Sequence, residues 1–397
     1  MSGASYVAID LGAESGRVVV GTLEQGRVRL AEMHRFANVP VRTPDGLHWD
    51  ILRLYAEILD GLRLAAQRYD AALAGIGVDS WGVDYGLIDA AGRLLGNPYS
   101  YRDARTDGMS EQAARTVSSR EQYARTGIAQ LPFNTIYQLM ALGRSDDHSV
   151  DLAVALLMIP DLLHYWLCGE RAAEYTNATT TGALGVDGTW ARDLLDRLDA
   201  PSHMLLPPSP AGTRLGLVRQ AVRDACNLAA VPVYLPATHD TGCAVVAVPA
   251  DQQMGTHAYI SCGTWSLLGL ELDQPILSDE ARRAGFTNEG GVAGTYRFLT
   301  NISGLWLVQE CRRAWARHGV SWEYEDLANQ AATVPTPNVV FDVDDALFLH
   351  PEDMPEAINT VLARTGQQPI TYAPELIRAV LENLALKYRV QLERASS

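Results

Sequence analysis

Two glycine-containing loops carry the residue types best suited to phosphate chemistry. The first is DLGAESGR at 10–17, and the second is CGTWS at 262–266; each follows a short apolar run. Glycine permits close backbone approach and a positive φ, so Gly12 and Gly16 could let backbone N–H groups reach a phosphate. A tight turn between strands would explain either loop alone. Because the loop type occurs twice, we favour a phosphate site.

Side chains of the first loop fit the same chemistry. Ser15 and Arg17 can donate hydrogen bonds to phosphate oxygens, and Asp10, at the end of a predicted strand, can hold Mg²⁺ directly or through water.

The segment THDTGCA at 238–244 supplies a candidate general base. Asp240 follows a predicted strand at 231–235, where a carboxylate could accept the proton of a substrate hydroxyl during phosphoryl transfer. An aspartate that caps the next helix would have the same sequence appearance. Both interpretations stay open from the residues alone.

A third polar segment, GVDSWGVDY at 77–85, combines Asp79, Trp81 and Asp84. Carboxylates and an aromatic face suit the hydroxyls and C–H faces of a sugar. Trp81 could equally be a core residue and Asp84 a turn residue. The aromatic and polar segments at 101–106 and 131–139 have no spacing that specifies a chemistry.

Several common chemistries are excluded by missing residues. Lys387 is the only lysine among 32 basic side chains, so a Walker P-loop, a protein-kinase site and Schiff-base catalysis all lack their lysine. The sequence contains no GxSxG, HExxH, paired CxxC or complete GxGxxG. The five cysteines are widely spaced, which favours buried thiols in a reducing compartment.

Composition points to a folded protein that does not bind nucleic acid or a membrane. The 397 residues are 47% hydrophobic and 20% charged, which is typical of globular domains. The net charge of -15 repels polyanions. The N-terminus has no basic segment before Asp10, and the most apolar stretch, 152–167, is interrupted by Pro160 and Asp161. We therefore expect a cytoplasmic protein; the oligomeric state stays open.

The predicted elements form two similar series. Strands at 6–10, 18–23 and 28–35, a helix at 50–70 and a strand at 76–79 make the first. Strands at 258–261, 267–272 and 295–300 and a helix at 302–317 make the second. Such a pair resembles the α/β, two-domain actin and hexokinase (ribonuclease H-like) fold, in which paired loops hold nucleotide phosphates without a lysine. We place the domains at 1–236 and 237–397.

The motifs together resemble the FGGY family of carbohydrate kinases, and within it the rhamnulokinase branch. They run in order along most of the chain, as VAIDLGAESGRVV, GVDSWGVDYGLID, YRDART, LPFNTIYQL, MIPDLLHYWLCGE, EYTNATTT, THDTGCAVVAVP, SCGTWSLLG, TNEGG and NISGLWLVQE.

The resemblance implies ATP- and Mg²⁺-dependent phosphorylation of L-rhamnulose to L-rhamnulose 1-phosphate, with Asp240 as catalytic base and Asp10 as metal ligand. It implies nucleotide contacts by Ala13, Glu14, Ser15, Gly16, Arg17, Thr264 and Gln309. It implies sugar contacts by Gly82, His239, Asp240, Thr241 and Asn301.

One part of the family pattern is missing. Family members continue past the predicted helix at 373–397 into a strand, a glycine-rich loop that contacts adenosine, and further helices. The resemblance therefore implies an incomplete second domain that binds ATP weakly. Another ketose or polyol kinase of the family and a catalytically inactive sugar-binding relative are the alternatives.

Overall fold

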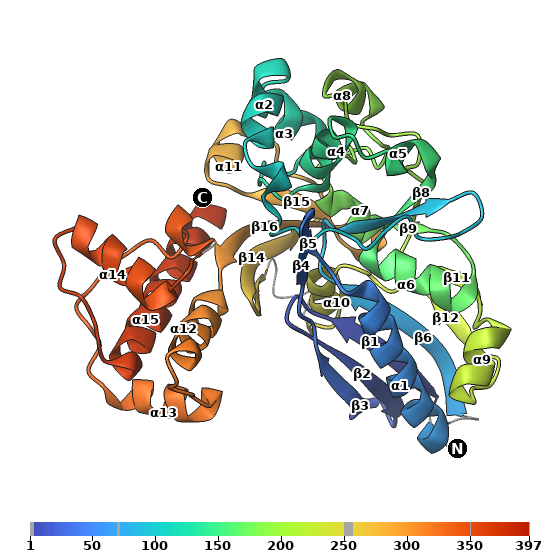
Figure 1. Cartoon of the computed structure of the whole chain (residues 1–397), viewed down its shortest axis with the longest axis horizontal. Helices are drawn as coiled ribbons and strands as arrows, with labels where there is room; N and C mark the ends of the chain where they lie inside the picture. The colour runs from blue at the N-terminus through green and yellow to red at the C-terminus, as the bar shows by residue number, and fades with distance from the viewer. Residues whose placement is uncertain (1–3, 70–71, 250–256, 350, 397) are drawn as a thin grey trace. The chain divides into compact units, whose positions relative to one another are not determined.

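The computed structural model of the protein describes residues 4–69, 72–249, 257–349 and 351–396. It separates into two compact units. Unit 1 comprises Met1–Ala250 and Glu271–Phe298, and unit 2 comprises Asp251–Leu270 and Leu299–Ser397. Figure 1 shows the course of the chain and the element labels used below.

Unit 1 is built on a six-stranded sheet in the order β11-β12-β6-β1-β2-β3. Its strands are β1 (Ser5–Leu11), β2 (Ser15–Glu24), β3 (Arg27–Ala37), β6 (Leu73–Ser80), β11 (Arg214–Leu217) and β12 (Pro232–Tyr234). Strands β1, β6 and β12 run parallel, and β1-β2-β3 is an antiparallel meander. In β1, Val7, Ile9 and Leu11 are buried and Tyr6 and Ala8 are exposed, as expected when successive side chains alternate between faces.

Helix α1 (Ile51–Tyr69) packs against this sheet (Figure 1). The backbone N–H of Arg53 donates to the Asp50 carboxylate at 3.2 Å, which confirms Asp50 as the cap of the helix. Gly61 has no room for a side chain, because a Cβ there would collide with Val18 of β2. The absence of a Cβ thus lets α1 approach the sheet closely.

The rest of unit 1 includes short helices and three strand pairs. The pairs are β4 (Val41–Thr43) with β5 (Gly46–His48), β7 (Tyr85–Asp89) with β8 (Ala153–Met158), and β9 (Ala173–Glu174) with β10 (Pro208–Ser209). The helices are α2 (Met109–Thr116), α3 (Ser119–Thr126), α4 (Thr135–Gly143), α5 (Ser149–Leu152), α6 (Ile159–Cys168), α7 (Tyr175–Thr180), α8 (Arg192–Arg197), α9 (Gln220–Cys226), α10 (Asp240–Val246) and α11 (Asp279–Arg283).

A second sheet has the order β13-β14-β16-β15. Its strands are β13 (Ala258–Cys262), β14 (Trp265–Leu272), β15 (Thr287–Gly290) and β16 (Tyr296–Ser303). The predicted second series of three strands and a helix is confirmed as β13, β14, β16 and α12 (Trp306–Arg317). The sequence reading missed β15. It also began the helix too early, because Ile302 and Ser303 still belong to β16.

Unit 2 is completed by three further helices, α13 (Tyr324–Thr333), α14 (Met354–Arg364) and α15 (Ala373–Ala395). A separate apolar core of this unit includes Leu376, Val380 and Leu384 of α15. Leu386, which we expected on the same face, is 48% exposed. It lies two residues after Leu384 and so points to the opposite side of the helix.

Candidate functional site

The parallel strands of unit 1 bring the predicted carboxylates to one end of the sheet. Asp10 of β1 is in register with Asp79 of β6. The next residue of β6, Ser80, forms a bridge with His239, and its backbone N–H donates to the Thr238 carbonyl at 2.9 Å. Asp10, Asp79 and Asp240 therefore lie at the carboxyl ends of three neighbouring strands, where ligands of open α/β sheets bind.

The three carboxylates influence one another. Burial raises the pKa of Asp79 well above its usual range, and the charges of Asp10 and Asp240 raise it further. Burial also raises the pKa of Asp240, with His239 and the Thr241 hydrogen bonds acting in the opposite direction. Asp79 is thus held towards its neutral form, and Asp240 becomes a stronger base than a free aspartate.

The Asp240 carboxylate has one engaged and one available oxygen. Its Oδ1 accepts hydrogen bonds from the Thr241 backbone N–H at 2.5 Å and from Thr241 Oγ1 at 3.2 Å. In the described part of the chain no hydrogen bond is recorded to Oδ2, and the side chain is 37% exposed. Asp240 is the first residue of α10 and its side chain does not cap that helix, whose N-cap is His239. The alternative that Asp240 is a helix cap is wrong.

A buried glutamate holds the segment that precedes this base. Glu174 is fully buried, and its Oε2 accepts from both the backbone N–H and the hydroxyl of Thr238 at 2.9 Å. The same carboxylate accepts from the backbone N–H and the hydroxyl of Thr176 in α7. Sequence reasoning assigned Glu174 no role. The only sequence feature that could have indicated this role is the position of Glu174 directly before a threonine-rich helix.

The first glycine loop is shaped by packing rather than by unusual backbone angles. Neither Gly12 nor Gly16 has the positive φ that we considered for them. A Cβ at Gly16 would collide with the Phe36 ring, so that glycine serves close packing in the sheet. Arg17 forms an ion pair with Asp10 at 2.6 Å, and both side chains are partly exposed.

The predicted sugar segment contains a strained turn. Val83 has a φ of 66°, which is unusual for a β-branched residue. The Thr180 hydroxyl accepts from the Val83 N–H at 3.1 Å, and the Val83 carbonyl accepts from Thr135 Oγ1 at 2.6 Å. A Cβ at Gly82 would lie 2.8 Å from Thr180 Oγ1, so only glycine fits there without a shift. Strain of this kind is typical of functional sites.

Asp84, next to that turn, organises aromatic side chains. Its Oδ2 accepts from the indole N–H groups of Trp49 at 2.6 Å and Trp81 at 3.1 Å, and from the Tyr101 N–H at 3.0 Å. Gln138 donates to Oδ1 at 2.9 Å. Burial raises the pKa of Asp84 to about 6 against these hydrogen bonds. Trp81 is 5% exposed and belongs to the core, so the core interpretation is confirmed for it.

The site residues predicted in and around the second series of strands lie in unit 2. Thr264 is in the loop between β13 and β14, Asn301 is in β16, and Gln309 is in α12. The Thr264 carbonyl accepts from the Trp306 N–H at 3.0 Å, which attaches this loop to the start of α12. Gln309 Oε1 is buried without a hydrogen-bond partner among the described residues.

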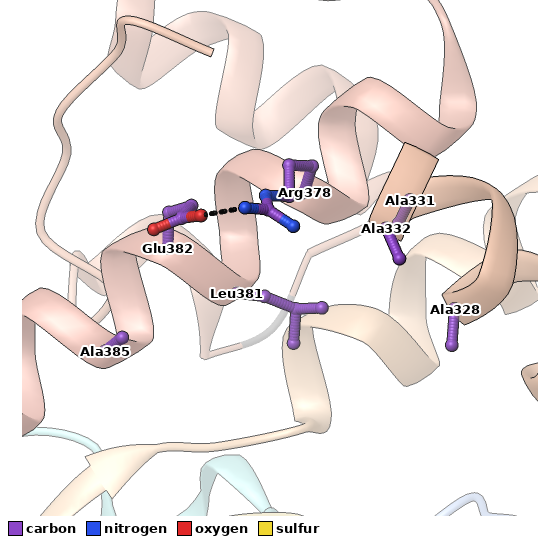
Figure 2. A pocket seen from close by; sticks show the side chains of 7 residues that line it. All are labelled: Ala328, Ala331, Ala332, Arg378, Leu381, Glu382 and Ala385. Atoms are coloured by element: carbon purple, nitrogen blue, oxygen red, sulfur yellow. Dashed lines mark ion pairs between the residues drawn. The ribbon is translucent and has the colours of Figure 1, made fainter. Parts of the chain in front are cut away.

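Unit 2 also contains a small cavity that involves none of the predicted residues. It has a volume of about 220 Å³ and lies between α13 and α15 (Figure 2). The lining residues are Ala328, Ala331, Ala332, Arg378, Leu381, Glu382 and Ala385. Arg378 and Glu382 form an ion pair at 2.6 Å on its wall. Apart from this ion pair, the lining side chains are apolar.

Three further observations concern metal ligands, membrane-spanning helices and cysteines. Among the described residues, no group of three or more histidines, cysteines, aspartates and glutamates could hold a metal ion. No helix in that part of the chain is long and apolar enough to cross a membrane. All five cysteines are free. Cys226 and Cys311 are buried as we expected, but Cys168 and Cys243 are only half-buried and Cys262 is exposed.

Comparison with known proteins decides the family. The N-terminal domain of the FGGY family of carbohydrate kinases matches residues 5–247, and the C-terminal domain of that family matches residues 258–397. The chain belongs to the FGGY family of carbohydrate kinases. The resemblance inferred from the motifs is therefore confirmed.

Curated relatives are similar over nearly the whole chain. The rhamnulokinase of Bacteroides thetaiotaomicron is 38% identical over 98% of this chain and 79% of its own length. That of Oceanobacillus iheyensis is 40% identical, with 96% and 80% covered. That of Pectobacterium atrosepticum is 42% identical, with 97% and 76% covered. The chain is thus shorter than these relatives, as the motif comparison implied.

Solved structures confirm the two-domain FGGY kinase fold. A ligand-bound xylulose kinase from Lactobacillus acidophilus has a TM-score of 0.73 at 17% identity, with 96% of this chain and 76% of that chain covered. A xylulose kinase from Rhodospirillum rubrum gives 0.73 at 18%, with 98% and 80% covered. At such identity the likeness concerns the fold alone.

Proposed function

We propose that this FGGY kinase is a rhamnulokinase that transfers the γ-phosphoryl group of ATP to L-rhamnulose and forms L-rhamnulose 1-phosphate. The observation that carries the substrate is the identity of 38–42% to three rhamnulokinases over 96–98% of the chain. The carboxylates at the end of the unit 1 sheet supply groups for phosphoryl transfer.

In the proposed reaction Asp240 is the general base. The substrate hydroxyl oxygen attacks the γ-phosphorus while Asp240 Oδ2 accepts the hydroxyl proton, and the bond to the bridging oxygen of ADP breaks. Because Thr241 engages Oδ1, the carboxylate is held with Oδ2 available to the substrate. The raised pKa of Asp240 favours the proton transfer.

We assign the sugar contacts to Gly82, His239, Thr241 and Asn301. The nucleotide contacts fall to Ala13, Glu14, Ser15, Gly16, Arg17, Thr264 and Gln309. Arg17 and backbone amides would meet the phosphates, because the chain offers no loop lysine.

Mg²⁺ fits the residues present at Asp10. This ion keeps several waters and binds through one or two carboxylates together with substrate phosphates, so it needs no cluster of three protein ligands. Asp10 is partly exposed and its ion pair with Arg17 is on the surface, where exchange of partners costs little. When bound, Mg²⁺ would neutralise charge on the phosphates.

A coupled assay of ADP release with a sugar panel tests the proposal. L-rhamnulose should have a higher kcat/KM than L-fuculose, D-xylulose and glycerol, because a site built for given hydroxyls penalises analogues that leave polar groups unpaired. If D-xylulose or glycerol is turned over more efficiently, the substrate assignment is wrong and the family assignment stands. If no sugar is phosphorylated even at saturating ATP, the proposed activity of this chain is wrong.

A further inference from the structure

A buried charged pair lies against the imidazole ring of His239. The side chain of Arg297 is 1% exposed and that of Glu289 is 8% exposed. Arg297 Nη2 lies 3.1 Å from His239 Nδ1 and 3.1 Å from Glu289 Oε2. Arg297 Nε donates to the Gly290 carbonyl at 3.0 Å, which fixes the guanidinium plane. Of these residues, only His239 was predicted from the sequence as a site residue.

The pair determines where the imidazole carries its proton. A guanidinium can only donate hydrogen bonds, so Nδ1 is the acceptor in its bond with Arg297. A neutral ring that accepts at Nδ1 carries its proton on Nε2. Glu289 Oε2 is also 3.1 Å from Nδ1 and would favour the other tautomer, but it has no hydrogen bond of acceptable geometry. The geometry therefore favours the proton on Nε2.

The other ring nitrogen faces the proposed base. His239 Nε2 lies 3.4 Å from Asp240 Oδ1. With a proton on Nε2 this contact is favourable, whereas without one a lone pair would face a carboxylate oxygen. Nε2 is therefore the ring nitrogen on the Asp240 side, where the proposed function places the substrate hydroxyl.

We propose that Arg297 is a positioning residue for phosphoryl transfer, which by donating to Nδ1 keeps His239 as a hydrogen-bond donor through Nε2 towards the substrate hydroxyl next to Asp240. This inference rests on the proposed function. It adds Arg297, a residue outside the predicted site, to the proposed mechanism. The Nε2–H orients the hydroxyl oxygen, and Asp240 Oδ2 takes the hydroxyl proton.

Glu289 keeps the arginine in place. Burial disfavours its charged form, the positive charge of Arg297 acts in the opposite direction, and the pKa of Glu289 lies below its usual value. The guanidinium meanwhile keeps one nitrogen, Nη1, without a hydrogen-bond partner in the described part of the chain. A buried ion pair with an unsatisfied donor contributes little to stability, which supports a functional role for this pair.

The first test observes the tautomer directly and needs no activity. Histidines of the intact chain are labelled with ¹⁵N, and long-range ¹H–¹⁵N spectra are recorded at pH 7.5, with His239→Gln identifying the signal. The expected wild-type pattern is a neutral ring protonated at Nε2. In Arg297→Met the Nδ1-protonated form should become populated, while Arg297→Lys, which keeps a donor, should retain the wild-type pattern.

The second test separates positioning from folding. Arg297→Met should lower kcat for the preferred sugar by about 10- to 100-fold, the usual cost of a misplaced reacting group, with KM for ATP within about twofold. Arg297→Lys should recover part of kcat. Arg197→Met, which removes the exposed partner of Glu121, is the matched control and should leave kcat unchanged.

Each outcome decides the matter. A wild-type ring protonated at Nδ1 overturns the proposal, as does a folded Arg297→Met with wild-type tautomer and kcat. If Arg297→Met does not fold, the wild-type spectrum and the Arg297→Lys kinetics still decide. If the wild type phosphorylates no sugar, the proposed function fails, while the spectra still report on the tautomer.

Discussion

At the scale of single residues, the site depends on carboxylates whose surroundings differ. Asp79 is buried and favours its neutral form, whereas the side chain of Asp240 is 37% exposed and one of its oxygens has no hydrogen bond from the described residues. Two aspartates at the same end of the sheet thus gain different protonation behaviour from burial and hydrogen bonding. Of these two carboxylates, Asp240 has the exposure and the raised pKa that the proposed base requires.

Replacement of Asp240 by asparagine should remove most of the activity. The side chain keeps its shape and its bonds to Thr241, but an amide does not accept the hydroxyl proton. We expect kcat to fall by about 100-fold or more, with a sugar KM within a few-fold of wild type. Steady-state kinetics measures both. Asp60→Asn, on the exposed surface of α1, is the control; an Asp240→Asn enzyme within a few-fold of the wild-type rate would place the base elsewhere.

His164 should make stability depend on pH. It is buried in α6, its Nε2 accepts from the Val78 N–H at 3.0 Å, and burial lowers its pKa to about 3. The unfolded chain, with a pKa near 6.5, takes up a proton first as the pH falls, so this residue's contribution to stability is lost below about pH 6.5.

Urea unfolding of wild type and His164→Gln measures this effect. Between pH 7.5 and pH 5 the stability advantage of the wild type should shrink by about 2 kcal/mol, since each pH unit below 6.5 costs about 1.4 kcal/mol. The glutamine carbonyl can still accept from Val78 and does not titrate. An advantage that is constant across this range would show that His164 is protonated equally in both states.

At the scale of elements, the ends of strands and the turns after them place the functional groups. β1, β6 and β12 end at the same edge of the sheet, and the strained Gly82–Val83 turn follows β6 directly. Glu174 and Thr180 of the α7 segment bind both the segment before Asp240 and this turn. One short helix therefore supports two parts of the proposed sugar site.

Gly82→Ala tests this support. The added Cβ would lie 2.8 Å from Thr180 Oγ1 and must displace the hydroxyl that accepts from Val83. We expect a loss of about 1–3 kcal/mol in the free energy of unfolding, typical of overpacking, and a higher KM for the sugar. Gly216→Ala, where the nearest atom is 3.5 Å away, is the matched control. Equal stability and KM in both variants would mean that the turn tolerates a side chain.

At the scale of the whole molecule, the chain must handle phosphates with almost no lysine. Lys387 of α15 lies 2.9 Å from Asp342 and 2.8 Å from Asp344, and its side chain is 20% exposed. Its charge is used within unit 2. The net charge of -15 leaves arginine, backbone amides and a metal ion to meet an anionic nucleotide.

Lys387→Met should therefore spare the chemistry and weaken the fold. We expect kcat for the preferred sugar within about twofold of wild type and a loss of about 1–3 kcal/mol in stability, since two charged hydrogen bonds disappear. Kinetics and thermal unfolding check the two parts. Arg389→Met, which removes an exposed pair with Glu393, is the control for charge. A kcat reduced tenfold with an unchanged melting temperature would give this lysine a direct role in the reaction.

Much of this architecture could be predicted from the sequence, because apolar periodicity reports on single elements. The strands around Asp10, the helix after Asp50 and the second strand series all follow from it. β15 could not be recognised, since Thr287, Asn288 and Glu289 are buried polar residues without an apolar alternation. Glu289 and Arg297 are recognisable only when the fold brings them to His239, and no local pattern records that contact.

The Glu174 clamp has a consequence for the order in which the protein acquires its site during synthesis. Bonds from Glu174 to Thr176 join residues only two positions apart, so the acceptor is organised as soon as its own segment is made. Its bonds to Thr238 span 64 residues and form later. The segment that precedes Asp240 is therefore expected to join Glu174 only after residue 238 has been made, when the acceptor is already organised.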